Sequence, residues 1–179
     1  MTTSGQPAAL AALGEGRLAG SWTLDAARSQ VRLATKSMWG MVPVRGVFGE
    51  VSGSGTVTGA GTVTGTLTVA AGSIDTKIKK RDDHLRSADF FDAANYPDIN
   101  FSVEAVSPAA GGVTVSGGLT VRGTTRPVSF GAAVSVDDGE VTLDAEVPVN
   151  RADYGLTFNQ LGMMGMKSTI TIHAVFTRQ

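Results

Sequence analysis

The chain has 179 residues, which is enough for one domain with a core of its own. Its formal charge of −1 gives no long-range field that would attract nucleic acid or an anionic membrane surface, so we expect no nucleic-acid partner. The chain contains no Cys, and this excludes disulfides, thiolate catalysis and Cys-ligated metal centres.

Residues 1–20 are expected to form a loosely ordered tail with at most one helical turn. The first basic residue is Arg17, and the apolar part, residues 7–13, is short and mostly Ala. A secretory signal needs a basic start followed by a longer apolar stretch, so we expect an unprocessed cytoplasmic protein. No segment approaches the roughly 20 apolar residues that span a bilayer, and we therefore expect a soluble chain without an integral membrane segment.

From Ser21 onward the sequence alternates between apolar and polar residues, as expected for strands with one face toward an apolar interior. The clearest case is residues 62–69, where Thr on every second position alternates with Val63, Gly65, Leu67 and Val69. The alternation predicts eight principal strands, at residues 29–38, 44–57, 62–71, 98–106, 112–121, 127–136, 140–149 and 166–177. A short strand at residues 22–24 is predicted to precede them.

Turn residues separate these strands at the spacing expected for hairpins. Residues 59–61 lie at the centre of the repeat GTVTG-A-GTVTG, which predicts two arms of one hairpin, and residues 111–112, 122–125 and 137–139 mark further turns. Two segments lack the alternation. Residues 75–98 are rich in charge and predict one or two short helices, whereas residues 151–165 are expected to form a loop with an apolar tip.

Eight antiparallel strands joined by hairpins predict an all-β fold, a closed barrel over residues 21–179, because closure leaves no exposed strand edges. A barrel of about eight strands is either filled by its side chains or holds one small ligand. The predicted inward faces consist mainly of Val, Ala, Gly and Leu, which favours a cavity. A flattened, fully packed sandwich is the alternative at this point.

No catalytic constellation emerges from the residues. No Ser occupies a G-x-S-x-G motif, and His173 falls on the polar face of the last strand, where we expect it to point to solvent. His84 lies near Asp82, Asp83 and Asp89, which together could bind a divalent cation. Because several Lys and Arg residues crowd the same segment, we interpret these residues as a charged helical turn. We therefore expect no catalytic residue, no metal and no cofactor.

Seven sequence motifs, read in order, together identify a family. They are WTLD (22–25), VRGVFG (44–49), SIDT (73–76), RDDHLRSADFFD (81–92), YPDINF (96–101), GGLTVRGTTRPV (117–128) and RADYG (151–155). In order and spacing they closely resemble the YceI-like family over nearly all of residues 21–178. The resemblance implies a lipocalin-like antiparallel barrel whose hydrophobic tunnel holds a polyisoprenoid chain, such as the tail of a quinone or prenyl compound. Many relatives are periplasmic or secreted.

The predicted function is therefore to bind a long apolar isoprenoid-type lipid for carriage, storage or sequestration, without catalysis. Two alternatives stay open: a packed structural or interaction domain with no ligand, and an enzyme that acts on a bound lipid. A homodimer is the default expectation for a small protein of this kind. Arg81 and Arg86 are candidates for contact with a polar head group, although pairing of Arg81 with Asp75 or Asp82 is the preferred interpretation.

The predicted ligand-binding residues fall into two groups. The tunnel lining is predicted from the apolar strand faces and comprises Leu33, Phe48, Leu67, Val69, Phe101, Leu119, Phe130 and Leu143. The mouth is predicted from the segments that interrupt the strands and comprises Met38, Trp39, Leu85, Phe90, Phe91, Phe158, Leu161, Met163 and Met164, with Met41 and Met166 nearby. Met adapts its shape to irregular ligands. Two interpretations of the Met-rich loop stay equally open: a gate that opens and closes, and a plug that shields the barrel end.

Overall fold

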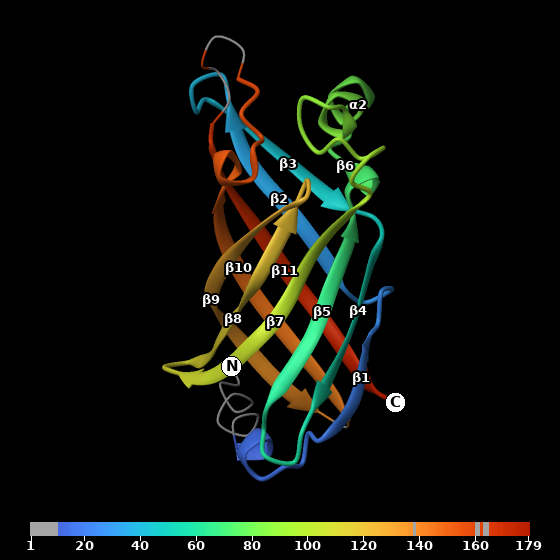
Figure 1. Cartoon of the computed structure of the whole chain (residues 1–179), viewed down its shortest axis with the longest axis vertical. Helices are drawn as coiled ribbons and strands as arrows, with labels where there is room; N and C mark the ends of the chain where they lie inside the picture. Colours follow the sequence, from blue (N-terminus) through green and yellow to red (C-terminus); the bar gives the residue numbers. More distant parts are fainter. Residues whose placement is uncertain (1–10, 138, 160–161, 163–164) are drawn as a thin grey trace.

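The computed structural model describes residues 11–137, 139–159, 162 and 165–179 as an elongated barrel (Figure 1). Its strands are β1 (Gly20–Leu24), β2 (Gln30–Ser37), β3 (Val42–Phe48), β4 (Val51–Val57), β5 (Val63–Ala70), β6 (Ile74–Asp75), β7 (Asp98–Ala109), β8 (Gly112–Val121), β9 (Thr124–Asp137), β10 (Glu140–Asn150) and β11 (Lys167–Arg178). The helix α2 (Lys79–Arg86) lies between β6 and β7, and the 3₁₀ turns η1 (Ala71–Ser73) and η2 (Arg151–Tyr154) flank β6 and β10.

The barrel closes through eight strands in the order β1, β4, β5, β7, β8, β9, β10 and β11, with β11 pairing back to β1. Every pairing is antiparallel. The predicted eight-stranded antiparallel barrel with few short helices is therefore confirmed. No helix in the described part of the chain is long and apolar enough to cross a bilayer.

At two positions in the barrel wall, two consecutive strands joined by a bend lie one after the other: β1 with β2, and β3 with β4. Strands β1 and β2 both pair with β11, at residues 176–178 and 169–173, and β4 and β3 continue alongside them. The strand predicted at residues 44–57 is thus interrupted at residues 49–50, which corrects that prediction. The Gly49 N–H donates to the Ser73 carbonyl instead of a neighbouring barrel strand, and this lets β3 pair with β6.

The hairpin predicted at residues 59–61 joins β4 to β5 as expected, with Val57 opposite Val63 and Gly55 opposite Gly65. A Cβ atom on Gly65 would lie 2.7 Å from the Ser54 carbonyl oxygen, so only glycine fits between the two strands here. Gly61 closes the turn at a φ of 86°, in the left-handed region that glycine adopts without strain.

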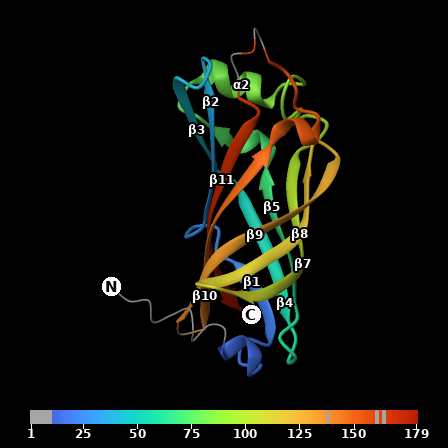
Figure 2. The ribbon, with the colours of Figure 1, turned by 90° about the vertical axis from the view of Figure 1, so that its left-hand side faces the viewer.

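The two ends of the barrel differ (Figures 1 and 2). At the lower end, a helical turn at residues 11–14 lies across the opening, and Ala12 and Leu18 are buried against Trp22. The Trp22 Nε1–H donates to the Leu18 carbonyl at 2.8 Å, and the Arg178 guanidinium lies 4.8 Å from the Trp22 ring centroid. At the upper end stand the β2–β3 hairpin, α2 and η2.

Candidate functional site

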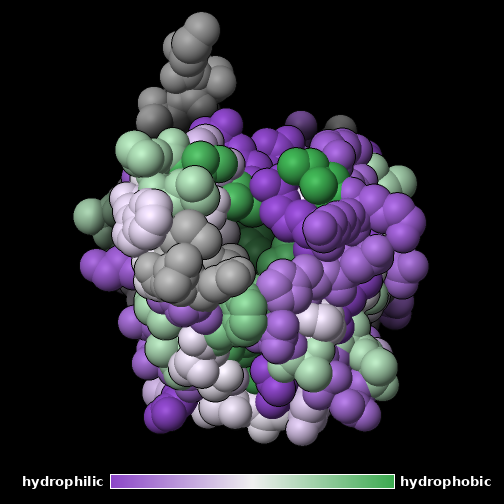
Figure 3. Space-filling model, turned by 90° about the horizontal axis from the view of Figure 1, so that it is seen from above, coloured by the Kyte–Doolittle hydropathy of each residue, from purple (hydrophilic) through white to green (hydrophobic). Residues whose placement is uncertain are grey.

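The upper half of the barrel contains a cavity of about 130 Å³, and its wall is almost entirely apolar. Strand residues form most of the wall, and Leu85, Phe90 and Phe91 from α2 and the segment after it form its upper side. Seen from above, the molecule is hollowed at an apolar centre, with hydrophilic surface along the right-hand side of the hollow (Figure 3). Apolar cavities of this kind stay dry and accept apolar guests.

A second cavity of about 180 Å³ lies in the lower half. Strands β4 and β5 form one side of its wall, and Val side chains of β7 to β10 with Leu143 and Phe176 form the other. Leu13, Leu18 and Trp22 line it from the N-terminal segment and the first strand. Leu67 lines both cavities, so the two spaces lie next to each other along the barrel axis.

Two aromatic rings mark the boundary between the cavities. The Phe101 and Phe130 ring centroids are 5.4 Å apart, and both side chains line only the upper cavity. Val103, the next inward residue on β7, and Val134, further along β9, line only the lower cavity. The interior thus holds two adjoining apolar cavities, with the Phe101–Phe130 pair at the boundary between them, and we call the two together the apolar channel.

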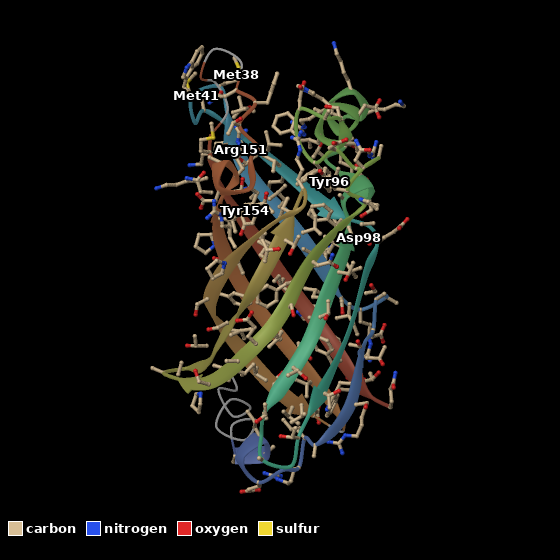
Figure 4. All side chains as sticks on the ribbon, viewed as in Figure 1. Met38, Met41, Tyr96, Asp98, Arg151 and Tyr154 are labelled. Atoms are coloured by element: carbon tan, nitrogen blue, oxygen red, sulfur yellow. The ribbon has the colours of Figure 1, made fainter. Side chains whose placement is uncertain are left out.

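Arg151 is the one charged residue among the described residues in the wall of the upper cavity. Its guanidinium donates to the carbonyls of Leu156, Phe158 and Gly165, at 2.6, 2.7 and 2.9 Å, and lies 5.7 Å from the Phe90 ring centroid. Burial lowers the pKa of Arg151 from its ordinary value. The side chain thus ties the segment after η2 onto the top of the barrel, where Figure 4 shows it close to Tyr154.

Helix α2 is fixed to the barrel by polar contacts with the β6 region. The buried Asp82 carboxylate accepts hydrogen bonds from the backbone N–H and the hydroxyl of Thr76. Arg81 donates to Thr76 as well and not to Asp75 or Asp82, which corrects the predicted ion pair. Arg86 donates to the carbonyls of Gly72 and Ile74. Leu85 is thereby held against the upper cavity.

The two His residues have structural partners. The His84 ring meets those of Phe90 and Phe158 edge-on, at centroid distances of 5.0 and 4.9 Å, and its Nε2 lies 2.8 Å from Asp89. His173 lies on the exposed face of β11, where its Nδ1 is 2.6 Å from Asp144, as its strand position predicted. No group of three or more possible metal-ligating side chains occurs among the described residues.

The structure brings most of the predicted ligand-binding residues together. The upper cavity is lined by Leu33, Phe48, Leu67, Val69, Leu85, Phe90, Phe91, Phe101, Leu119 and Phe130, and Leu143 lines the lower one. Phe158 packs against the upper core without lining a cavity. Met38 and Trp39 are instead exposed on the β2–β3 hairpin and line neither cavity. Leu161, Met163 and Met164 lie outside the described residues, so the gate stays a prediction.

Other wall residues were missed by the sequence reasoning. Ile99, Val121 and Ile172 follow the same alternation as the predicted lining and were open to prediction from it. Tyr154 and Leu156 lie in and after η2, and Leu18 lies in the N-terminal segment, where no strand periodicity marks the inward face.

The geometry is accompanied by a clear family match, since residues 22–176 match the model of the YceI-like domain. The chain belongs to the YceI-like family. A UPF0312 protein of Staphylococcus aureus strain MSSA476 is 32% identical over 149 residues, which cover 78% of this chain and 84% of the relative. Protein YceI of Escherichia coli strain UMN026 is 39% identical over 66 residues, covering 37% of this chain and 35% of that protein.

Solved structures share the barrel. BcnA of Burkholderia cenocepacia aligns with a TM-score of 0.78 at 26% identity, over 85% of this chain and 98% of that one. A polyisoprenoid binding domain from Saccharophagus degradans, implicated in plant cell wall breakdown, aligns with a TM-score of 0.73 at 18% identity, over 88% of this chain and 98% of that domain. At that identity the second likeness shows the fold alone.

Proposed function

We propose that this YceI-like protein binds a long apolar isoprenoid-type lipid, such as a quinone or a prenyl compound, inside its barrel for carriage, storage or sequestration. The observation that carries the proposal is the apolar channel, in which two adjacent cavities of about 130 and 180 Å³ share Leu67. The Saccharophagus degradans domain, which has the same fold, is described as polyisoprenoid binding, and this is consistent with such a ligand.

The chemistry of the channel wall suits a hydrocarbon chain. An isoprenoid tail has no hydrogen-bonding groups, so its affinity comes from apolar surface removed from water, at about 25 cal/mol per Å² before entropy costs. Space for one water-sized group takes roughly 10–15 Å³, so each cavity has room for on the order of ten such groups. This corresponds to about two or three five-carbon isoprene units per cavity.

The direction of binding follows from the two barrel ends. Trp22 and Leu18 close the lower end, whereas the upper cavity adjoins the hollow visible from above (Figure 3). A guest that enters at the upper end places its tail past the Phe101–Phe130 pair and keeps its head group near Arg151. The role of α2 in this proposal is to hold Leu85 over the tail.

The proposal includes no catalytic step. A packed domain with no ligand is the second candidate, and the two cavities argue against it because native interiors are usually filled to crystal-like density. The cytoplasmic location and the homodimer stay predictions.

Organic extraction of the purified protein followed by mass spectrometry tests the proposal. We expect a stoichiometric apolar compound, or stoichiometric uptake of an added C20 prenyl alcohol by protein stripped of lipid. A protein that carries none and takes up none would overturn the proposal in favour of the packed domain. A compound recovered in chemically altered form would replace simple binding with catalysis.

A further inference from the structure

The β2–β3 hairpin ends in an exposed apolar tip, which we define as residues 38–42. Met38, Trp39, Met41 and Val42 have exposed fractions of 42, 62, 76 and 41%, and together they make up most of the large apolar side chains exposed on the described surface. Figure 4 shows Met38 and Met41 at the extreme upper end, beyond the wall that carries Arg151 and Tyr154. The tip therefore stands beside the opening of the upper cavity.

The turn itself does not require these side chains. Met38, Trp39 and Gly40 have φ angles of 51, 55 and 88°, in the left-handed region that favours Gly, Asn and Asp. In three other turns the positive φ angles fall on glycine, at Gly61, Gly111 and Gly139, and in the β8–β9 turn they fall on Arg122 and Gly123. The β2–β3 turn differs in placing two large apolar residues in this region. Two large apolar residues at left-handed positions are unfavourable for the hairpin alone, so their presence points to an interaction outside the barrel.

Basic residues lie on the hairpin that carries the tip and on the segment that leads into α2, across the upper end (Figure 1). Residues 36–45 and 77–81 contain six Lys or Arg and no Asp or Glu. Lys77 and Lys79 form ion pairs with Asp75 and Asp83, whereas no ion pair joins the exposed Lys36, Arg45 or Lys80 to any other described residue. The two segments share the upper end because β3 pairs with β6, which leads into α2. Asp82, Asp83 and Asp89 lie on the α2 side of the upper end and offset part of this charge. We call the three basic residues without an ion pair in the described part of the chain, Lys36, Arg45 and Lys80, the basic rim.

We propose that the tip inserts into the interface of an anionic phospholipid bilayer, with Lys36, Arg45 and Lys80 contacting the lipid head groups. Trp is favoured at this interface because its ring is apolar and its N–H is polar, and basic residues near the surface add electrostatic attraction. A convex tip of five residues is small beside the 20–30 residues that each partner contributes to a stable protein interface. A bilayer fits the tip better than a protein does.

This inference rests on the proposed function, because the purpose of membrane docking is to deliver a lipid to the cavity. An isoprenoid lipid resides in a membrane and is almost insoluble in water, so it must pass from the bilayer to the cavity without crossing bulk solvent. A tip inserted beside the upper opening brings that opening to the membrane surface. The basic rim and the apolar tip therefore supply the entry route that the channel needs.

Binding to lipid vesicles tests the apolar part of the inference. Vesicles contain about 30% phosphatidylglycerol and about 70% phosphatidylcholine, in comparison with vesicles of phosphatidylcholine alone. Trp39 is exposed and Trp22 is 5% exposed, so a blue shift of tryptophan emission on adding vesicles reports on Trp39, and Trp39→Phe removes it. We expect Trp39→Ser with Met41→Ser to lower the partition coefficient at least about tenfold. Tyr96→Ser, a change at an exposed aromatic outside the tip, is the matched control and keeps wild-type binding.

A charge-reversal pair tests the electrostatic part. Lys36→Glu with Arg45→Glu is expected to lower binding to the anionic vesicles by more than about 25-fold, since each basic residue near the surface contributes roughly fivefold. Arg17→Glu changes an exposed Arg at the lower end and is expected to leave vesicle binding near the wild-type level. High salt should weaken the wild-type protein's binding in the same direction.

The failure of this inference is distinguishable from failure of the proposed function. Uptake of a C20 prenyl alcohol from ethanol, with no vesicles present, tests the channel alone and is expected to be the same in wild type and the Trp39→Ser, Met41→Ser variant. Wild-type protein that ignores anionic vesicles, or a tip variant that binds them equally well, would overturn membrane docking. So would light scattering that finds a dimer abolished by the tip substitutions, since the tip would then bind a second copy.

Discussion

Filling the upper cavity with a larger side chain should block lipid binding. Val147 lies on β10, is 4% exposed and lines the upper cavity, and its neighbour Glu146 points outward. Val147→Trp adds about seven non-hydrogen atoms to a space that holds on the order of ten water-sized groups. The substituted ring therefore occupies most of the space that one or two isoprene units would fill.

The expected magnitude follows from the carbon atoms displaced. Excluding one five-carbon unit loses about 4 kcal/mol at about 0.8 kcal/mol for each buried CH₂ group, which is close to 1000-fold in Kd. The assay is displacement of a fluorescent apolar probe by a C20 prenyl alcohol, with thermal unfolding as the check on folding.

Glu146→Trp is the matched control, because it adds a ring of the same size to the outer face of the same strand. It should leave Kd unchanged. A folded Val147→Trp protein with wild-type affinity would show that the ligand does not occupy the upper cavity, and the reasoning from its volume would fail.

Four further results are expected. Phe101→Ala removes one ring of the pair at the boundary between the cavities, so denaturant unfolding should show a loss of about 3–5 kcal/mol while longer prenyl chains gain affinity relative to shorter ones. Trp22→Ala opens the lower end, and a similar loss of stability should come with faster release of bound lipid in a stopped-flow assay. Asp82→Ala leaves the buried Thr76 donors unpaired, which should cost about 1–3 kcal/mol and speed hydrogen exchange in α2, whereas Asp83→Ala should have a smaller effect. Arg28 lowers the pKa of both Glu140 and Asp25, so the stability that these carboxylates contribute is present above their ordinary pKa values, 4.5 and 3.8, and is lost as the pH falls below them. Glu140→Gln should therefore reduce the loss of stability at low pH, measured by unfolding at a series of pH values. The change should be small because the pair is exposed.

The eight-stranded fold followed from the sequence because its signal is local. Alternation along residues 62–69 assigns Leu67 and Val69 to the inner face whatever the partner strand is, and both line the channel. The bend at Gly49 was not predictable in the same way. It depends on a hydrogen bond to Ser73, which is remote in sequence, and no change of periodicity marks it.

The ends of the barrel were the least predictable part of the site. Met38 and Trp39 are residue types expected at a cavity mouth, but the four-residue turn directs their side chains outward. The backbone geometry of that turn could not be predicted from the sequence. Leu18 and Trp22 form the floor of the channel through a contact between the N-terminal segment and the first strand. Such contacts between irregular segments depend on tertiary packing that periodicity does not encode.

Strand β11 pairs with β10 along one edge and with β1 and β2 along the other, so it is the strand that closes the barrel. Without β11 the other strands pair into two separate sheets, one of β1, β4, β5, β7, β8, β9 and β10 and one of β2, β3 and β6. The apolar inner faces of both sheets stay open to water until β11 joins them, about 150 residues after β1. During synthesis the nascent chain therefore exposes the apolar residues of the barrel interior until β11, its last strand, has been made. A chain shortened before Lys167 should aggregate rather than fold as a smaller barrel.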